Sequence, residues 1–446
     1  MRDEAANYRV GEQDAGAQSA AQLSRKPVAA DVLGRQISIP KPAHAPFRAL
    51  LAKALIRRAA SQLPFILTIH PDNGACACDV SSPGRPALRL RRPELFYRRL
   101  GTRGLIGFGE GYQAGDWDSD DLPALLTVFA ARVDTFIPSW LQGIRGHSAA
   151  PKRPGEEEQT IEGARRNAGH HYALPNELFA AFLDETMCYS SAIFLVGDDG
   201  RVMADEDGLA DAQRRKIDRL LDLTAVGQGT RLLEIGAGWG ELAVRAARRG
   251  AFVHAVTNMT EHAALTRDRA ARAGVSERVR VEVRDYRELV ERSGAYDAVV
   301  SVEMIEAVGR GYWPEYFKTL ERVLAPGGRI GLQVMTMHHD RMIKTSKTYT
   351  WIDKYIFPGG LILSIPAIEH ALAGHTSLRI ANTHEFSDHY RATLALWRRR
   401  FNRNWPMVAE LGFDEVFRRT WDFYLAYCEA GFASGYLSVN QMLLRA

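Results

Sequence analysis

Short apolar runs alternate with helical stretches throughout the second half of the chain, and this rhythm restricts the fold more than any other feature. Five runs bounded by turn residues have the length and composition of buried strands, and they span 231–235, 251–257, 278–283, 296–304 and 328–336. The stretches between them have the period of amphipathic helices. Strands and helices that alternate at this spacing predict a doubly wound parallel α/β sheet with helices on both faces.

Two further strand candidates follow much later, at 377–386 and 436–445, and the residues between them are helical in character. A sheet whose last two strands form a long-range pair fits the Rossmann-like class I methyltransferase fold, with helical insertions, better than a dinucleotide-binding dehydrogenase. This step is an analogy between folds, so the function has to be sought in individual residues.

The sharpest motif is LEIGAGWGE, residues 233–241, which joins the first strand of the alternating set to its first helix. Its glycines are spaced G-x-G-x-G, whereas a dinucleotide fingerprint would require a third glycine at Glu241. S-adenosylmethionine needs no pyrophosphate cradle because its charged end is an amino acid, and Glu234 suits that ligand better than a diphosphate. The APGG sequence at 325–328 is common in methyltransferases. A glycine loop alone is a weak signal, and a tight turn without a ligand is the alternative.

Two other strand ends complete the expected cofactor site. Asp285, at the end of the third strand, is placed to accept a hydrogen bond from the adenine amino group. The second strand ends in Thr257 and Asn258 rather than in an acidic residue for the ribose hydroxyls, which departs from the general pattern. The cofactor-binding residues predicted around the loop are Glu234, Gly236, Gly238, Trp239, Gly240, Thr257, Asp285 and Tyr286.

The first part of the chain is organised differently. Residues 1–30 predict a disordered tail, 31–145 an N-terminal accessory domain of mixed α and β structure, 146–167 a linker, and 168–446 the methyltransferase domain. The linker prediction rests on proline, glycine and both charges in a run without a hydrophobic period. In the accessory domain, 47–62 predicts an amphipathic helix whose apolar face carries Phe47, Leu50, Leu51, Ala54 and Leu55.

Composition excludes several classes of protein. The formal net charge of +4 is too small to indicate a nucleic-acid partner. No apolar run reaches the roughly 18 residues of a membrane-spanning helix, and the N-terminus lacks the apolar stretch of a signal peptide. Four cysteines are too few for a disulfide scaffold, which favours a cytoplasmic protein. We expect no metal site, because Cys76 and Cys78 are too close together and the adjacent histidines at 170–171 and 338–339 would point apart.

Four longer segments resemble the cyclopropane-fatty-acyl-phospholipid synthase family. They are HHYALPNELFAAFLDETMCYSSAIF at 170–194, SVEMIEAVGRGYWPEYFKTLERVLAPGGRIGLQ at 301–333, WIDKYIFPGGLILS at 351–364 and WDFYLAYCEAGFASGYL at 421–437. Together the resemblance covers about 165–446. GLIGFGEGYQAGDW at 104–117 is similar to the N-terminal domain of the long bacterial branch, which includes enzymes that make 10-methylene or 10-methyl branched stearate.

The resemblance implies a substrate and a reaction. The substrate is the cis double bond of an unsaturated acyl chain, usually esterified in a phospholipid. The alkene attacks the sulfonium methyl of S-adenosylmethionine and leaves a carbocation. Proton loss from the new methyl group then closes a cyclopropane ring, whereas a hydride shift before proton loss gives an exocyclic methylene.

The resemblance also implies roles for individual residues. Glu306 occupies the position of the family's active-site glutamate, and Tyr390 matches a tyrosine close to the reacting centre. Tyr189 and Ser190 match residues that touch the cofactor. The alternatives are a solvated loop carboxylate for Glu306 and ordinary core packing for the tyrosines. Cys428 matches a cysteine near the pocket, and we assign it no nucleophilic role.

Two positions depart from the family pattern. Many members hold a bicarbonate ion as the base, with a cysteine and a histidine where this chain has Ser191 and Gln333. Both residues can still donate a hydrogen bond to an anion. We therefore expect Ser191, Glu306, Gln333 and Tyr390 to surround the base, with bicarbonate as the candidate ion. The family sequence HYDLGN is replaced by HYALPN, which places Ala173 and Pro175 in the segment that covers the cofactor.

A phospholipid substrate implies peripheral contact with the inner face of an anionic membrane. Two arginine clusters are candidates, Arg89, Arg91, Arg92, Arg98, Arg99 and Arg103 in the first, and Arg398, Arg399, Arg400 and Arg403 in the second. Pairing with acidic neighbours is the alternative, and so is a homodimer. The loop at 354–361 is either an insertion or acyl-channel loop or a buried turn. A methyl product would need a separate reductase.

Two rival functions stay open at this point. One is an S-adenosylmethionine-dependent methyltransferase of a small amphipathic molecule, in which Glu306 would deprotonate an amine or a hydroxyl. The other is a lipid-binding protein without turnover, which Ser191 and Gln333 alone support.

Overall fold

A computed structural model of the chain describes residues 37–69, 84–132, 154–172, 174–346 and 348–446. The predicted tail, Cys76, Cys78, Ala173 and residues 146–153 of the predicted linker lie outside the described residues.

Seven strands form one sheet in the order β11-β12-β10-β9-β6-β7-β8. In chain order they are β6 (Arg231–Ile235), β7 (Phe252–Thr257), β8 (Val279–Val283), β9 (Tyr296–Val302), β10 (Leu324–Met337), β11 (Arg379–Glu385) and β12 (Leu437–Arg445). Strands β6 to β10 pair in parallel, and β12 pairs antiparallel with both β10 and β11. The predicted parallel sheet and its late pair of strands are confirmed.

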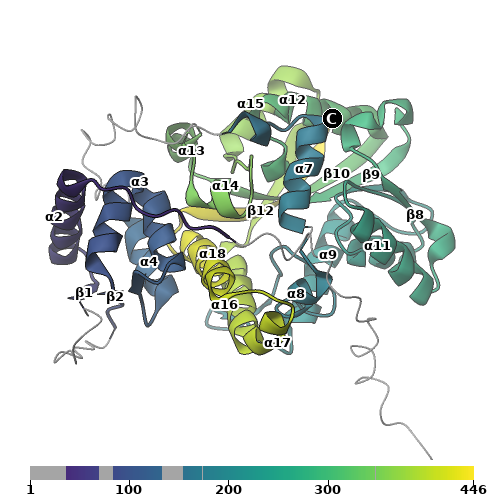
Figure 1. The fold of residues 1–446 in the computed structure, drawn as a ribbon. Helices are drawn as coiled ribbons and strands as arrows, with labels where there is room; N and C mark the ends of the chain where they lie inside the picture. The colour runs from purple at the N-terminus through teal and green to yellow at the C-terminus, as the bar shows by residue number, and fades with distance from the viewer. Residues whose placement is uncertain (1–36, 70–83, 133–153, 173, 347) are drawn as a thin grey trace, which may run out of the picture.

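Helices cover both faces of this sheet (Figure 1). Leu232 belongs to the apolar cluster formed with α9, α10 and α11, while the next residue, Leu233, belongs to the cluster formed with α12 and α15. Successive side chains of a strand point to opposite faces, so β6 is buried on both sides and reads as a continuous apolar run. The helices are α9 (Leu209–Leu223), α10 (Glu241–Arg248), α11 (Thr260–Arg272), α12 (Trp313–Val323) and α15 (Ile365–His375).

Helical insertions extend the sheet domain. Three of them separate β11 from β12, namely α16 (Ser387–Arg403), α17 (Trp405–Glu410) and α18 (Glu415–Ala433). Others are α7 (Ile161–Tyr172), α8 (Asn176–Ala180), α13 (His339–Thr345) and α14 (Trp351–Tyr355), and the small hairpin of β4 (Leu195–Val196) and β5 (Val202–Met203) follows α8. Within the described residues, no helix is both long enough and apolar enough to cross a bilayer.

The second half of the predicted linker is structured and packs on the sheet domain. Residues 155–167 form the turn Gly155–Glu157 and the first half of α7. Arg287 donates a hydrogen bond to the carbonyl of Gln159 at 2.9 Å, and Arg165 forms an ion pair with Glu288 at 3.0 Å. The segment is held by polar contacts, such as the ion pair of Arg165 with Glu288, and not by an apolar face. A sequence without a hydrophobic period therefore looked like a linker.

The N-terminal region consists of α2 (Pro46–Gln62), α3 (Pro93–Gln113), α4 (Leu122–Ala131) and a sheet of β1 (Ile66–Ile69), β2 (Ala87–Leu90) and β3 (Trp117–Asp118). The predicted apolar face of α2 is wrong, because Phe47 and Leu50 are 79% and 65% exposed, whereas the helix buries Ala52, Ile56 and Ala59. The backbones of α2 and α3 nearly touch, since a Cβ on Gly101 would lie 2.4 Å from the carbonyl oxygen of Arg48. Two helices this close can pack only where small side chains lie between them, so α2 buries the face that carries Ala52 and Ala59.

A buried polar seam joins this region to the rest of the protein. Glu110 of α3 is fully buried and forms ion pairs with Arg103 at 3.2 Å and with Lys354 of α14 at 2.7 Å. The Tyr112 hydroxyl donates to Asp422 of α18 at 2.7 Å. Figure 1 shows α3 and α4 beside α18 and α14, with α2 at the outer end of the molecule. The N-terminal region is therefore docked by an ion pair between α3 and α14 and by a buried hydrogen bond between α3 and α18.

Candidate active site

The glycine loop leaves β6 and turns at once into α10. Gly236 and Gly240 have φ values of +91°, and Gly238 has a φ of +51°, all in the region that glycine tolerates best. A Cβ on Gly240 would lie 2.8 Å from the Cα of Thr266, whereas one on Gly238 would meet nothing within 4 Å. The loop therefore presents open space on the side of Gly238 and close packing on the side of Gly240.

Glu234 fits the amino-acid end of S-adenosylmethionine. It is the fourth residue of β6, its side chain is buried, and its Oε2 atom has no hydrogen-bond partner in the described structure. Burial raises the pKa of this carboxyl well above its usual value. A cationic ammonium group at this oxygen would stabilise the carboxylate, so the orphaned atom suits the predicted cofactor. Trp239, a residue of the loop, ties the loop to α8 because its indole N–H donates to Asn176 at 2.8 Å.

Asp285 begins the turn after β8, and Arg287 satisfies its carboxylate. Arg287 Nε and Nη2 lie 2.7 Å and 2.9 Å from the two oxygens, and the Arg287 backbone N–H also donates to the carboxylate. These contacts, despite burial, lower the pKa of Asp285. The hydroxyl of Thr257 accepts from the Met259 N–H at 3.2 Å, and the buried hydroxyl of Tyr286 has no hydrogen-bond partner in the described structure. Adenine and ribose contacts at these residues stay predictions.

Tyr189 and Ser190 lie in the loop that follows α8. The Tyr189 hydroxyl hydrogen-bonds Tyr424 of α18 at 2.7 Å and the His171 ring at 3.2 Å. The Ser190 hydroxyl accepts from the buried ammonium of Lys216 at 2.6 Å. The loop is thus fixed to α18 on one side and to α9 on the other.

Glu306 is buried in the short turn after β9. Its Oε1 accepts the Met335 N–H at 2.5 Å, while its Oε2 has no hydrogen-bond partner in the described structure. Burial, and then repulsion from the neighbouring Glu303, raise the pKa of Glu306 to about 8. The Glu306 carbonyl accepts from the Leu361 N–H at 2.8 Å, so the loop at 354–361, which is half-buried apart from the buried Ile356 and Gly359, is held against this turn.

A second glutamate, Glu303, was missed by the sequence analysis. Its Oε1 accepts hydrogen bonds from the Ser191 N–H at 2.9 Å and from Gln333 Nε2 at 2.7 Å, and its Oε2 accepts from the Tyr390 hydroxyl at 2.7 Å. Three of the predicted catalytic residues therefore meet on a carboxylate that was not predicted. The available signal was its place directly after a parallel strand, where site residues concentrate.

Aromatic rings pack against the rings of Tyr189 and Tyr390. The ring centroids of Tyr390 and Phe432 lie 4.5 Å apart, and those of Tyr189 and Trp397 lie 5.3 Å apart. Further rings in contact with this group belong to His171, Phe179, Phe182, Phe357, Trp421 and Tyr424. Such faces attract a positive charge that forms next to them.

The thiols do not enter this chemistry. Burial raises the pKa of Cys428 to about 12 and that of Cys188 to about 11, so both stay protonated at neutral pH. Among the described residues no group of three or more His, Cys, Asp or Glu side chains could hold a metal ion.

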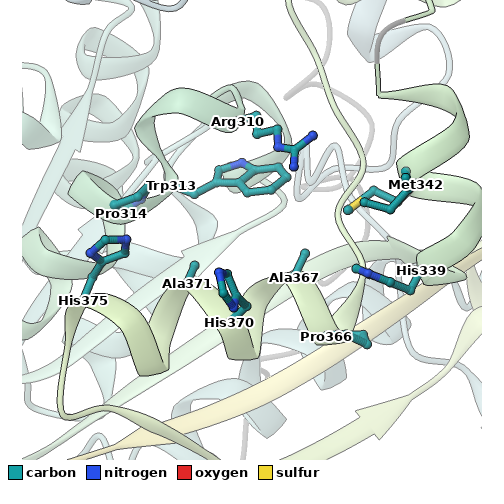
Figure 2. A pocket seen from close by; sticks show the side chains of 11 residues that line it. Arg310, Trp313, Pro314, His339, Met342, Pro366, Ala367, His370, Ala371 and His375 are labelled. Carbon is teal, nitrogen blue, oxygen red and sulfur yellow. The ribbon is translucent and has the colours of Figure 1, made fainter.

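A separate cavity of about 480 Å³ lies between α12, α13 and α15. Figure 2 shows the α15 side chains facing Trp313 and Arg310 across it, with His339 and Met342 at one end. None of its lining residues is a predicted catalytic or cofactor residue. It is distinct from the cluster around Glu303.

Comparisons with known proteins identify the family. The family model described as mycolic acid cyclopropane synthetase matches residues 159–442. The chain belongs to this family. It is an S-adenosylmethionine-dependent methyltransferase, and its family transfers one carbon to unsaturated fatty acyl chains.

Individual relatives of this synthetase-family chain agree. It is 48% identical to the tuberculostearic acid methyltransferase UfaA1 of Mycobacterium tuberculosis over 408 residues, which cover 91% of this chain and 93% of the relative. It is 29% identical to the cyclopropane-fatty-acyl-phospholipid synthase of Escherichia coli, over 83% of this chain and 88% of the relative. The solved mycolic acid cyclopropane synthase CmaA1, complexed with SAH and CTAB, has a TM-score of 0.56 at 26% identity, over 66% of this chain and 99% of that one.

The two loop glycines predict different losses. Gly240→Ala is expected to cost about 2–4 kcal/mol of folding free energy, because the new Cβ collides with Thr266 at an unfavourable φ. Gly238→Ala should cost only the strain of its positive φ, about 1–2 kcal/mol, and mainly weaken cofactor binding, because its Cβ enters the open side of the loop. Thermal unfolding and titration with S-adenosylhomocysteine measure the two effects. Equal losses of stability would contradict the assigned packing.

Proposed function

We propose that this methyltransferase transfers one carbon from S-adenosylmethionine to the cis double bond of an acyl chain in a phospholipid, through a carbocation. We further propose that the product is branched, with an exocyclic methylene, rather than a ring. The observation that carries the proposal is the neighbouring pair of carboxyls, the half-buried Glu303 and the buried Glu306, among aromatic side chains beside the glycine loop. The extensive similarity to a fatty acid methyltransferase favours the branched product.

Each group of residues has a task in this reaction. The bound cofactor supplies an electrophilic methyl group. Glu234 and the glycine loop orient its amino-acid end, which brings the donor into alignment. The aromatic rings exclude water and tolerate the cation on the acyl chain. We assign Glu306 and Tyr390 to the part of the pocket in which that charge develops. A methyl product then requires a separate reductase that adds a hydride and a proton to the methylene.

Mass spectrometry of the acyl chains tests the proposal. The purified protein is incubated with S-adenosylmethionine and oleoyl phospholipid vesicles, and fragmentation of the fatty esters locates the added carbon. An exocyclic methylene is the expected product. A ring across the former double bond would correct the product alone. No added carbon would overturn the proposal and favour a small amphipathic substrate or a lipid-binding role.

The predicted arginine clusters give little support to membrane contact. Every arginine of the first cluster pairs with a carboxylate of this chain, the partners being Asp120, Asp118, Asp116, Glu94 and Glu110. In the second cluster, Arg398 pairs with Asp422 and Arg403 with Glu206. Because these arginines are paired with carboxylates, exposed or buried, the two clusters offer little net positive charge to a bilayer.

Helix α2 is a better candidate for peripheral membrane contact. Phe47 and Leu50 are exposed on its outer side, and the basic Arg48, Arg57 and Arg58 are exposed on the same helix. Apolar side chains bordered by arginines match an anionic lipid surface in both hydrophobicity and charge. We propose that α2 rests in the interface of the inner membrane leaflet. A homodimer through this face is the competing arrangement.

Replacing Phe47 and Leu50 together with aspartate is expected to weaken binding to anionic phospholipid vesicles by at least about tenfold, because two apolar side chains no longer enter the interface. Vesicle sedimentation measures the binding. Val290→Asp is the control, since Val290 is an exposed apolar residue elsewhere in the chain. Unchanged binding, or a change in oligomeric state alone, would contradict membrane contact through α2.

A further inference from the structure

The convergence of three hydrogen-bond donors on Glu303 has a chemical consequence. The donors come from the loop before β4, from β10 and from α16, so three separate parts of the chain serve one carboxylate. We propose that Glu303 is the catalytic base of the carbon transfer and occupies the place where a bicarbonate ion was expected. This inference rests on the proposed function.

A chain of amides fixes the donor on Gln333. Arg219 donates to Gln441 Oε1 at 2.7 Å, so the amide nitrogen of Gln441 faces the other way and donates to Gln333 Oε1 at 3.0 Å. Gln333 must then direct its own nitrogen at Glu303. Since a guanidinium can only donate, the orientation of each amide follows from the first contact. The network therefore presents a donor, and not an acceptor, to the carboxylate.

Glu303 lies between the glycine loop and Tyr390. The next residue, Met304, packs against the loop, since a Cβ on Gly236 would meet Met304 Cγ at 3.5 Å. On the other side the Tyr390 hydroxyl holds Oε2. Glu303 as a whole residue is half-buried, while Ser191, Gln333 and Tyr390 are buried. Its position suits a group that must reach the transferred carbon.

The backbone at Glu303 is held in a costly conformation. Its φ is +48°, a region that residues other than glycine seldom adopt and that costs on the order of 1 kcal/mol. The Glu303 N–H still donates to the Gln333 carbonyl at 2.7 Å, which continues the β9–β10 ladder. A strained residue whose side chain is gripped by three donors is typical of a functional position.

The two neighbouring carboxyls divide the roles of base and acid. Burial raises the pKa of Glu303, while the charge of Lys216 and the three hydrogen bonds oppose that rise. Glu306 accepts only from backbone N–H groups, whereas Glu303 accepts from Ser191, Gln333 and Tyr390 and also faces the charge of Lys216, so we assign the negative charge of the pair to Glu303 and the proton to Glu306. An ionised carboxylate with a raised pKa is a competent base near neutral pH.

The proton transfer balances without another reactant. The alkene electron pair forms a bond to the methyl carbon as the carbon–sulfur bond breaks, which leaves a neutral thioether and a cation on the acyl chain. After the hydride shift, a carboxylate oxygen of Glu303 forms a bond to a hydrogen of the new methyl group. The electrons of that C–H bond become the second bond of the methylene, and Glu303 becomes neutral.

A bicarbonate ion would need the same donors. The Ser191 N–H, the Gln333 amide and the Tyr390 hydroxyl already point at Glu303. A second anion there would also face the charge of Glu303 at short range, which low polarity makes unfavourable. The substitutions that removed a cysteine and a histidine from the family pattern are consistent with a site that no longer holds an ion.

The test combines Glu303→Gln and Glu303→Gly with wild-type protein in bicarbonate-free buffer. Wild-type activity should not change when bicarbonate is removed or added. Glu303→Gln should lower kcat about 100-fold or more and leave the affinity for S-adenosylhomocysteine unchanged. With a trideuterated methyl donor, the isotope effect on the residual rate should rise, because removal of the methyl hydrogen becomes limiting. Glu303→Gly relieves the backbone and opens space, so added formate should restore activity.

Glu369→Gln is the control, because Glu369 is an exposed residue on α15, and its activity should equal that of the wild type. Activity of Glu303→Gln within about twofold of wild type, or a wild-type rate that depends on bicarbonate, would overturn the inference while the proposed function stands. Wild-type protein that adds no carbon to any acyl chain would overturn the proposed function itself. If Glu303→Gln fails to bind S-adenosylhomocysteine, the formate experiment on Glu303→Gly decides between the outcomes. Failure of formate to restore activity would then count against Glu303 as the base.

Discussion

Glu306→Gln is expected to lower carbon transfer by about 100-fold or more and, at the same time, to raise the melting temperature of the protein at pH 8. The loss of activity follows from charge. When a cation forms on the acyl chain, it favours ionisation of Glu306, whose Oε2 has no partner in the described structure. A glutamine has the same shape and cannot respond in this way.

The gain in stability follows from the raised pKa. The folded protein holds a proton on Glu306 up to about pH 8, whereas the unfolded chain releases it near pH 4.5. Between these values the folded state binds more protons, so the free energy of unfolding falls as the pH rises. Glutamine removes this penalty, which is worth roughly 2–4 kcal/mol at pH 8 and little at pH 5.

Thermal unfolding of both proteins at pH 5 and pH 8 measures this difference. The melting temperatures should be close at pH 5 and separate at pH 8, with the variant higher. Glu369→Gln again serves as the control and should show no separation. A variant that is less stable than wild type at pH 8 would contradict the assignment of a buried, neutral Glu306.

The second large effect concerns the seam between the N-terminal region and the sheet domain. Glu110→Ala is expected to cost about 3–5 kcal/mol of folding free energy, because the ammonium of Lys354 and the guanidinium of Arg103 lose a fully buried partner. Urea unfolding measures the loss. Activity should fall as well, since α14 leads into the turn whose Leu361 N–H binds the Glu306 carbonyl.

Glu94→Ala is the matched control on the same helix. Glu94 pairs with Arg98 four residues on, and its side chain is largely exposed, so the change should cost less than about 0.5 kcal/mol. If Glu110→Ala and Glu94→Ala lowered the free energy of unfolding equally, the buried ion pairs of Glu110 would contribute no more than an exposed pair.

Much of the fold could be predicted because its signals are local. Strand β6 was expected at 231–235 and is observed at Arg231–Ile235, since a strand buried on both faces is a short apolar run between turns. The face of α2 could not be predicted in the same way. Apolar residues occur on two of its sides, and the close approach of α3 at Gly101 decides which side is buried. That contact depends on residues about fifty positions away.

The site residues show the same difference between local signals and contacts made by residues far apart in the sequence. Glu306, Tyr390, Ser191 and Gln333 were expected through family resemblance, and the structure brings the last three together on Glu303. Glu303 itself was missed, because its donors are 112, 30 and 87 positions away and its left-handed φ leaves no sequence signature. The arginine clusters were candidates for membrane contact because their acidic partners, many of which lie on other elements, are not visible in the local sequence.

A base that belongs to the chain changes how the catalyst is renewed. A dissolved ion can accept a proton and diffuse away with it, so fresh base arrives from solution. Glu303 keeps the proton of each reaction and must return it to water before the next acyl chain can react. Glu303 as a whole residue is half-buried, whereas the residues that bind its carboxyl are buried, so the proton has to pass this cluster to reach water. Regeneration of the base thus becomes a step of every turnover cycle, independent of the supply of dissolved carbon dioxide.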